Sequence, residues 1–199
     1  MSTKSLEIYF LDNVAASDTF ANISSDLDGD IWKYGVMTPY IGAEVEDDTK
    51  FWYADMLKNR WQELLFQEII DKLELVNPHI KNYQFKSLDV KAGGKTAGMN
   101  GEPHIDRTFN FNVEGDGYMT FCYFPNKEWK DEWGGELQFF DADGEVIASF
   151  LPKPNTCVVF DSNIPHRGLG PNAGSDVLRK FITYKTFVHK RWNLTDSNS

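Results

Sequence analysis

The pattern of hydrophobic and polar positions divides the chain into two unlike parts. After a short strand at residues 6–10, the first part is mainly helical in pattern, and its clearest element spans residues 51–76. The apolar residues that recur there at the spacing of one helix face are Leu57, Trp61, Leu64, Ile69 and Leu73. Thr49 supplies N-capping chemistry, and Asn77-Pro78 ends the helix. We expect this apolar face to pack against a sheet.

Beyond residue 78 the pattern changes to short β-rich runs separated by turn residues. The runs are NYQFKSLDV, GYMTFCYF, GELQFF, EVIASFL, TCVVFD and KFITYKTFV. Asp143-Gly144 lies between two of them and is a hairpin signal. Short strands with no helices between them predict an antiparallel sandwich or barrel. We therefore expect one domain over residues 1–199, with largely helical support (1–80), a β-core (81–190) and a polar tail (191–199).

Composition narrows the class of protein further. Hydrophobic residues make up 41% of the 199 residues, enough to build a packed core, and the net charge is −10. That charge argues against binding nucleic acid or an anionic membrane surface. MSTKSLEIYF lacks the features of a signal peptide, and no run of 18 apolar residues occurs, so we expect a cytoplasmic protein. Cys122 and Cys157 form no CxxC motif and are expected to be buried free thiols.

Two stretches resemble functional motifs but fail in detail. AGGKTAG lacks the first glycine of a phosphate-binding loop, because Asp89 stands at that position, and no helix pattern follows. It is predicted to be a flexible loop. SSDLDGDIW resembles a calcium loop, but Gly29 comes too early and the closing glutamate is absent. It is predicted to be a turn.

The stretch EPHID at residues 102–106 carries the first candidate chemistry. Residues i and i+2 of an extended chain point to the same side, so His104 and Asp106 would project together. His166 follows 62 residues later (166 − 104) and ends the strand-like run CVVFDSNIPH. Two histidines and one carboxylate are the donors of the facial triad that binds Fe(II), and Zn²⁺ accepts the same donors. The alternative is a His-x-Asp pair that arises by chance at an exposed strand end.

An arginine opens the last long strand pattern, RKFITYKTFV. Alternation puts Arg179, Phe181, Thr183 and Lys185 on one face and Lys180, Ile182 and Tyr184 on the other. Burying Arg179 without an anionic partner would be costly, and a dicarboxylate cosubstrate would be such a partner. An exposed strand end is the simpler alternative for an arginine taken alone.

Together, HID, NKEWKDEWGGELQFFDADGE, LPKPNTCVVFDSNIPH and LRKFITYKTF resemble the 2-oxoglutarate- and Fe(II)-dependent oxygenases. The resemblance covers residues 83–190 in order and is strongest to the prolyl 4-hydroxylase-like branch, which includes the hypoxia-factor prolyl hydroxylases. It implies a mainly β fold, a double-stranded β-helix (jelly-roll) core with N-terminal α-helices. It also implies a dioxygenase that couples oxidative decarboxylation of 2-oxoglutarate to hydroxylation of a substrate C–H bond.

The resemblance assigns roles to individual residues. It makes His104, Asp106 and His166 the iron ligands, and it makes Arg179 the partner of the distal carboxylate of 2-oxoglutarate. The implied cofactors are Fe(II), with 2-oxoglutarate and O₂ as cosubstrates and ascorbate as a reductant.

Two tyrosines common in the family are replaced in this chain. One corresponds to Phe124, which cannot donate a hydrogen bond to the distal carboxylate, so Tyr118 or Thr183 is expected to substitute. The other falls near Lys91.

The resemblance favours peptidyl-proline 4-hydroxylation, with a peptide or protein as the substrate. A free amino acid or another small molecule is the competing enzyme hypothesis, and a jelly-roll binding module without catalysis is the non-enzyme hypothesis. Candidate substrate contacts are Arg107, Trp133 and Trp192, although structural packing is the simpler explanation for either tryptophan. Segments 34–48 and 107–117 are expected to flank the iron cleft, and their acidity favours a basic peptide.

Overall fold

Strands dominate the computed structural model, which describes residues 8–36, 50–55, 60–106 and 117–190. The α-helices of this part are α1 (Ser17–Asp26) and α2 (Gln62–Val76). The strands are β1 (Ile8–Leu11), β2 (Lys33–Val36), β3 (Lys50–Asp55), β4 (Tyr83–Lys95), β5 (Gly117–Phe124), β6 (Leu137–Phe140), β7 (Val146–Phe150), β8 (Thr156–Asp161), β9 (His166–Gly168) and β10 (Arg179–Lys190). Two short 3₁₀ helices, η1 (Pro78–Asn82) and η2 (Asp131–Trp133), complete the described elements.

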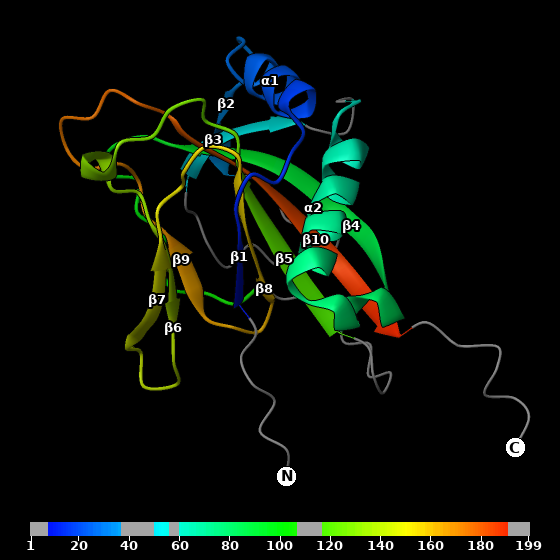
Figure 1. Cartoon of the computed structure of the whole chain (residues 1–199). Helices are drawn as coiled ribbons and strands as arrows, with labels where there is room; N and C mark the ends of the chain where they lie inside the picture. Colours follow the sequence, from blue (N-terminus) through cyan, green and yellow to red (C-terminus); the bar gives the residue numbers. More distant parts are fainter. Residues whose placement is uncertain (1–7, 37–49, 56–59, 107–116, 191–199) are drawn as a thin grey trace, which may run out of the picture.

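The strands form two antiparallel sheets that pack face to face (Figure 1). The large sheet has the order β1-β8-β5-β10-β4-β3-β2, and the small sheet has the order β7-β6-β9. Side chains from both sheets meet in the core between them, where Cys122, Phe124, Leu137, Phe139, Val158, Phe160 and Ile164 are buried. This is the jelly-roll core that the family resemblance implied, in a mainly β chain with helices near its N-terminus.

Helix α2 covers the outer face of the large sheet (Figure 1). The ring of Phe66 packs against Phe121 of β5 and Tyr184 of β10, at centroid distances of 5.5 and 5.2 Å. The predicted end of the helix is confirmed, because α2 stops at Val76 and the Asn77 side chain accepts a hydrogen bond from the His79 amide. The expected packing of this helix against a sheet is also confirmed.

The beginning of that helix was predicted wrongly. Residues 50–55 form β3, which pairs with β4, so Ala54 lies opposite Ala92. FWYAD is a short, continuous apolar run rich in aromatic residues, and a run of this length fits both a strand and a helix until a neighbouring strand is known. The predicted helical face is right at Ile69 and Leu73, which are buried, and wrong at Leu64, which is 44% exposed while Leu65 is fully buried. Leu57 lies outside the described residues.

The first 80 residues are therefore more than helical support. Strands β1, β2 and β3 extend the large sheet at both of its edges. β1 pairs with β8, and β3 covers the otherwise open side of β4. Their addition satisfies backbone groups that an exposed edge would leave unpaired.

The predicted flexible loop AGGKTAG is a strand over its first four residues. β4 runs through Lys95, and Gly93 lies opposite Phe181 of β10. The ring of Phe181 lies directly over Gly93, in the space that a side chain would need. Gly93 is therefore explained by close packing rather than by flexibility.

Two smaller predictions are confirmed. Asp143-Gly144 forms the turn between β6 and β7, and Gly144 has the positive φ of 84° that favours glycine. The Asp141 carboxylate accepts hydrogen bonds from the amides of Asp143 and Glu145, which fixes this turn. Both cysteines are buried free thiols.

Strand β10 is the centre of the large sheet and alternates as predicted. Phe181 points to the core between the sheets, whereas Ile182 and Tyr184 face α2. The register with β4 shifts after Lys185, where Thr186 pairs with Ser87 and Leu88 of β4 is left over, but the alternation of β10 continues and Thr186 is buried on the same face as Ile182 and Tyr184.

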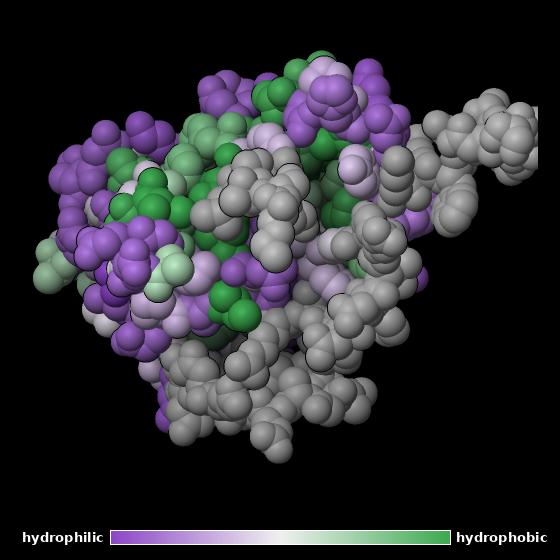
Figure 2. Space-filling view, turned by 90° about the horizontal axis from the view of Figure 1, so that it is seen from below, coloured by the Kyte–Doolittle hydropathy of each residue, from purple (hydrophilic) through white to green (hydrophobic). Residues whose placement is uncertain are grey.

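Figure 2 shows the surface at the lower end of Figure 1, where β10 finishes. Hydrophilic residues predominate on its described rim, with hydrophobic residues exposed between them. Within the described ranges, no helix has both the length and the apolar character needed to cross a membrane.

Candidate metal centre and cosubstrate site

Backbone hydrogen bonds bring the two segments of the candidate metal centre together. His104 and His166 form an antiparallel bridge, in which the amide of each donates to the carbonyl of the other at 2.9 Å. The amide of Asp106 donates to the carbonyl of Ser162 at 3.0 Å. The His-x-Asp stretch is therefore held against the turn that leads from β8 into β9.

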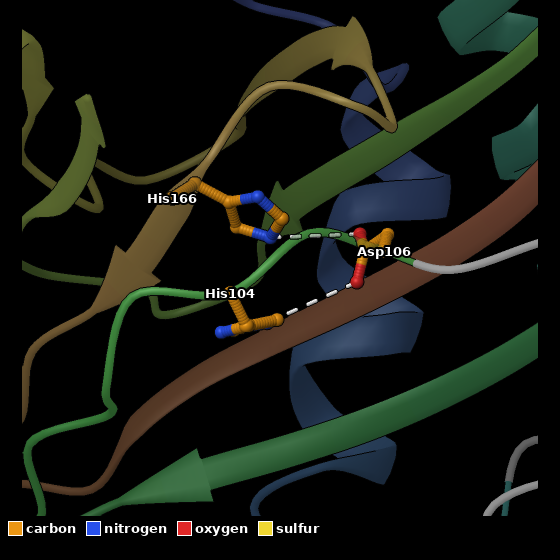
Figure 3. A group of neighbouring side chains, drawn as sticks. All are labelled: His104, Asp106 and His166. Carbon is orange, nitrogen blue, oxygen red and sulfur yellow. Dashed lines mark ion pairs between the residues drawn. The ribbon is translucent and has the colours of Figure 1, made fainter. Parts of the chain in front are cut away.

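The side chains of His104, Asp106 and His166 converge (Figure 3). Their candidate ligand atoms all lie within 4.8 Å of one another. Oδ2 of Asp106 is 3.5 Å from Nε2 of His166, and Oδ1 is 3.9 Å from Nε2 of His104. Adjacent ligands of one ion lie about 3 Å apart when the bonds are about 2.1 Å, so side-chain adjustments of about 1 Å would close the site.

Each imidazole is oriented by a backbone carbonyl. Nδ1 of His104 lies 2.9 Å from the carbonyl oxygen of Glu102, and Nδ1 of His166 lies 2.9 Å from that of Ile164. A carbonyl can only accept, so Nδ1 carries the proton and Nε2 presents its lone pair to the centre. Burial lowers the pKa of His166 to about 4, which keeps this ring neutral at physiological pH.

Asp106 is held by donors that the sequence did not identify. Oδ2 accepts a 2.6 Å hydrogen bond from the Thr120 hydroxyl and an ion pair from the Lys185 ammonium. The Thr120 oxygen lies 3.0 Å from the Ser162 hydroxyl, which must donate, because Thr120 already uses its only proton. Burial alone would raise the pKa of the Asp106 carboxyl, but Lys185, His166 and Thr120 together hold it well below its usual range.

Arg179 lies inside the core and is only 1% exposed. Its Nε donates to the carbonyl of Gly135 at 2.5 Å, and Nη2 is buried without a hydrogen-bond partner in the described part of the chain. Burial lowers the pKa of Arg179 to about 10, so the guanidinium stays charged at neutral pH. A buried donor without an acceptor is unfavourable and marks a place where an anionic ligand would bind.

Gly135 and Gly168 permit this position of the guanidinium. Gly135 has a φ of +80°, and a Cβ there would come within 3.1 Å of Cδ of Arg179. A Cβ on Gly168 would lie 3.7 Å from both Nη atoms. Gly168 is two residues after His166 on β9, about 7 Å along the strand. The guanidinium and the metal centre are therefore separated by roughly the length of a short dicarboxylate.

The two residues predicted to assist Arg179, Thr183 and Tyr118, lie at different distances from it along the sheet. Thr183 lies on the same face of β10, beyond Phe181. The Phe124 ring centroid is 5.2 Å from the Arg179 guanidinium, so a cation–π contact stands where the family's tyrosine would donate. Tyr118 pairs instead with Phe187, eight residues after Arg179 (187 − 179), or about 26 Å along β10. The structure does not bring Tyr118 to the guanidinium.

Lys95 is a second cation at this end of the core that the sequence did not suggest. It lies opposite Arg179 across β4 and β10, and its ammonium donates to the carbonyl of Gly168 at 2.9 Å. Lys91, where the family's other tyrosine falls, forms an ion pair with Asp89 at 3.1 Å. The predicted loop character of AGGKTAG concealed that Lys95 faces the core.

The candidate substrate residues receive limited support. Trp133 lies in η2 and packs edge-on against Trp129, at a centroid distance of 5.4 Å. Trp129 approaches Gly135 beside Arg179, so Trp133 belongs to the Arg179 end of the core rather than to the metal centre. Arg107 and Trp192 lie outside the described residues, as do most of segments 34–48 and 107–117.

Comparison with known proteins agrees with this geometry. Residues 91–188 match the family model of the 2OG-Fe(II) oxygenase superfamily, and the chain belongs to that superfamily. Its members use Fe(II), 2-oxoglutarate and O₂, so the class is that of 2-oxoglutarate-dependent oxygenases. No match to a curated protein was found.

Solved structures of several enzymes share the fold. A prolyl-4-hydroxylase from Pseudomonas putida is 16% identical, with a TM-score of 0.56 and coverage of 94% of this chain and 95% of that one. A prolyl hydroxylase from Trichoplax adhaerens, in complex with a hypoxia inducible factor peptide, is 16% identical, with a TM-score of 0.60 and coverage of 90% and 83%. The epimerase SnoN from nogalamycin biosynthesis is 13% identical, with a TM-score of 0.62 and coverage of 92% and 76%.

Proposed function

We propose that the protein is a 2-oxoglutarate- and Fe(II)-dependent dioxygenase that hydroxylates peptidyl-proline at C4. His104, Asp106 and His166 bind the iron, and Arg179 binds the distal carboxylate of 2-oxoglutarate. The single observation that carries this proposal is the presence, within one core, of three converging ligands and a buried arginine with an unpartnered Nη2. Such an arrangement needs both a cation and an anion to complete it.

The residues present suit both groups. Two neutral imidazoles and one carboxylate are donors that Fe(II) accepts while keeping positions open for further ligands. Bound iron supplies the oxygen activation, and the protein supplies orientation and a protected core. The carbonyls of Glu102 and Ile164 orient the two rings, and Thr120 and Lys185 orient Asp106.

Arg179 orients the cosubstrate from the far end of the core. A guanidinium can donate two parallel hydrogen bonds to one carboxylate, and Nη2 has that capacity free among its described contacts. Thr183 is the proposed hydroxyl donor between Arg179 and the metal centre, because it follows Phe181 on the same face of β10 and precedes Lys185, which contacts Asp106. Tyr118 has no part in this proposal. Ascorbate is proposed as the reductant that returns oxidised iron to Fe(II).

Peptidyl-proline is supported by two kinds of observation. The sequence runs that carry the family resemblance are most similar to the prolyl 4-hydroxylase-like branch. Two solved structures with this fold are prolyl hydroxylases, and one was determined in complex with a peptide. A peptide or protein is therefore the proposed partner at the metal centre.

A free amino acid is the second candidate substrate, and the charges beside the metal centre favour it. Asp89 and Lys91 lie on the inner face of β4, opposite Lys185 and Thr183 of β10. A zwitterion needs partners of both signs, and these three charged side chains supply them. SnoN shows that this fold also occurs in an enzyme that is an epimerase.

The test is a product assay with Fe(II), 2-oxoglutarate and ascorbate. Proline-containing peptides are expected to gain one oxygen, detected by mass spectrometry, with release of one succinate per hydroxyl group. Free L-proline is the comparison, and Asp106→Ala is the inactive control. If L-proline supports 2-oxoglutarate turnover as well as the peptides do, the peptide assignment is wrong and the free amino acid is favoured.

A further inference from the structure

Lys185 contacts the proposed metal centre directly. Its ammonium forms an ion pair with Oδ2 of Asp106, the oxygen that also accepts from Thr120. The Lys185 side chain is 22% exposed, compared with 9% for Asp106, so the pair is shielded from most of the solvent. Oδ1 is left as the oxygen through which Asp106 can reach an ion. A cation therefore lies beside the place where a second cation is expected to bind.

We propose that Lys185 couples metal binding to the binding of the anionic cosubstrate. This inference rests on the proposed function, because it takes Asp106 as a metal ligand. The ammonium offsets the charge of Asp106 and repels a divalent ion. Without the cosubstrate, the site therefore binds the metal weakly. A dianionic ligand reverses this effect, since it brings negative charge to the metal and to Lys185 together.

The charges in the core show why the coupling is expected to be large. A divalent ion, Asp106 and Lys185 together carry a net charge of about +2, which 2-oxoglutarate with charge −2 neutralises. Without Lys185 the same set carries about +1 before the cosubstrate binds, and −1 afterwards. Arg179 and Lys95 add two buried cations further along the same core. Lys185 thus shifts the site from one that favours the metal alone to one that favours metal and dianion together.

Two possible roles for Lys185 predict changes of opposite sign in metal affinity when its charge is removed. If Lys185 only orients Asp106, replacing it loosens the carboxylate, and the metal binds less tightly. If it opposes the ion, replacing it tightens metal binding, because Thr120 still holds Oδ2. The sign of the change in metal affinity therefore decides between them.

The experiment measures Mn(II) binding by calorimetry, with and without 2-oxoglutarate, in the full chain. Mn(II) permits binding to be measured without turnover. Lys185→Met is expected to bind Mn(II) at least tenfold more tightly than the unaltered protein when 2-oxoglutarate is absent. The factor by which 2-oxoglutarate strengthens Mn(II) binding is expected to fall by at least tenfold. By reciprocity, the metal then strengthens 2-oxoglutarate binding by a correspondingly smaller factor.

Two further variants control for charge and for position. Lys185→Arg keeps the cation and is expected to keep the coupling. Lys180→Met removes a lysine from the opposite face of the same strand, where it pairs with Asp28, and is expected to leave both affinities unchanged. A thermal melt of each variant confirms that it is folded.

The proposal is overturned if Lys185→Met binds Mn(II) equally well or less tightly, or if its coupling to 2-oxoglutarate is unaltered. The proposed function fails by a different result. Asp106→Ala would then retain Mn(II) affinity, and the comparison between lysine variants would not concern a metal ligand.

Discussion

The ring of Phe181 lies where a side chain at Gly93 would have to be. A Cβ on Gly93 would come within 2.1 Å of Cζ of Phe181, and two further ring atoms lie within 2.7 Å. Phe181 also lies beside Arg179, with 5.4 Å between the ring centroid and the guanidinium carbon. Gly93 of β4 thus leaves the space in which the Phe181 ring packs next to Arg179 of β10.

Gly93→Ala is expected to destabilise the protein by about 1–3 kcal/mol, because the ring must move or leave its rotamer. Gly117→Ala in β5 is the matched control, since a Cβ there meets nothing within 4 Å. Urea unfolding of both variants provides the measurement. Equal stability of the two variants would show that the Phe181 ring moves aside at no cost.

Asp106→Ala is expected to abolish turnover and Mn(II) binding while the protein stays folded. The carboxylate lies between the ends of strands rather than among the apolar core residues, and Lys185 can turn toward solvent when its partner is removed. Asp89→Ala removes another carboxylate from the same inner face and is expected to retain the metal. Calorimetry with Mn(II) and circular dichroism distinguish loss of the site from loss of the fold.

Arg179→Met is expected to raise the 2-oxoglutarate concentration needed for half-maximal rate by at least ~30-fold. Losing a charge-paired hydrogen bond in a closed site costs about 2–5 kcal/mol, and methionine keeps most of the side-chain volume. Lys180→Met is the control, because Lys180 faces the other side of the sheet and pairs with Asp28. A larger effect from Lys180→Met would mean that the cosubstrate binds elsewhere.

The metal-free protein is expected to lose stability as the pH falls from about 6.5 to about 4. The native state keeps His166 neutral over this range, whereas the unfolded chain takes up a proton, so acid favours unfolding by up to about 3 kcal/mol. Asp106 faces His166 and opposes this shift, whereas His104 and Lys185 reinforce it. The native state also lowers the pKa of Asp106, so protonation of this carboxyl reduces stability only at more acidic pH.

The measurement is the melting temperature as a function of pH in the presence of a chelator. His166→Asn is expected to flatten the profile above pH 4, and His79→Asn, which changes an exposed histidine, is expected to leave it unaltered. An unchanged slope in His166→Asn would assign the acid sensitivity to other groups.

Some parts of the fold could be predicted because a single local pattern decides them. The alternation along RKFITYKTFV places Arg179 and Thr183 toward the core without further information. Asn77-Pro78 ends α2 through backbone chemistry that the neighbouring residues determine. The hairpin turn at Asp143-Gly144 is equally local.

Other parts depended on contacts between distant segments. FWYAD becomes a strand because β4 offers it a partner, and Gly93 is needed only because Phe181 crosses above it. Thr120 and Lys185 become partners of Asp106 because β5 and β10 meet beside the His-x-Asp stretch. A sequence pattern records the face on which a residue lies, but not the residue that it meets there.

The backbone bridge between His104 and His166 has a consequence for the order of assembly. The two residues are 62 positions apart, and each reaches the other only after β9 has docked beside the His-x-Asp stretch. Closing the 62-residue segment between them costs chain entropy, so an unfolded or partly folded chain does not hold the two rings together. A metal ion that needs both rings therefore binds the finished protein and not its precursors, so loading stabilises the native state selectively and can serve as a measure of completed folding.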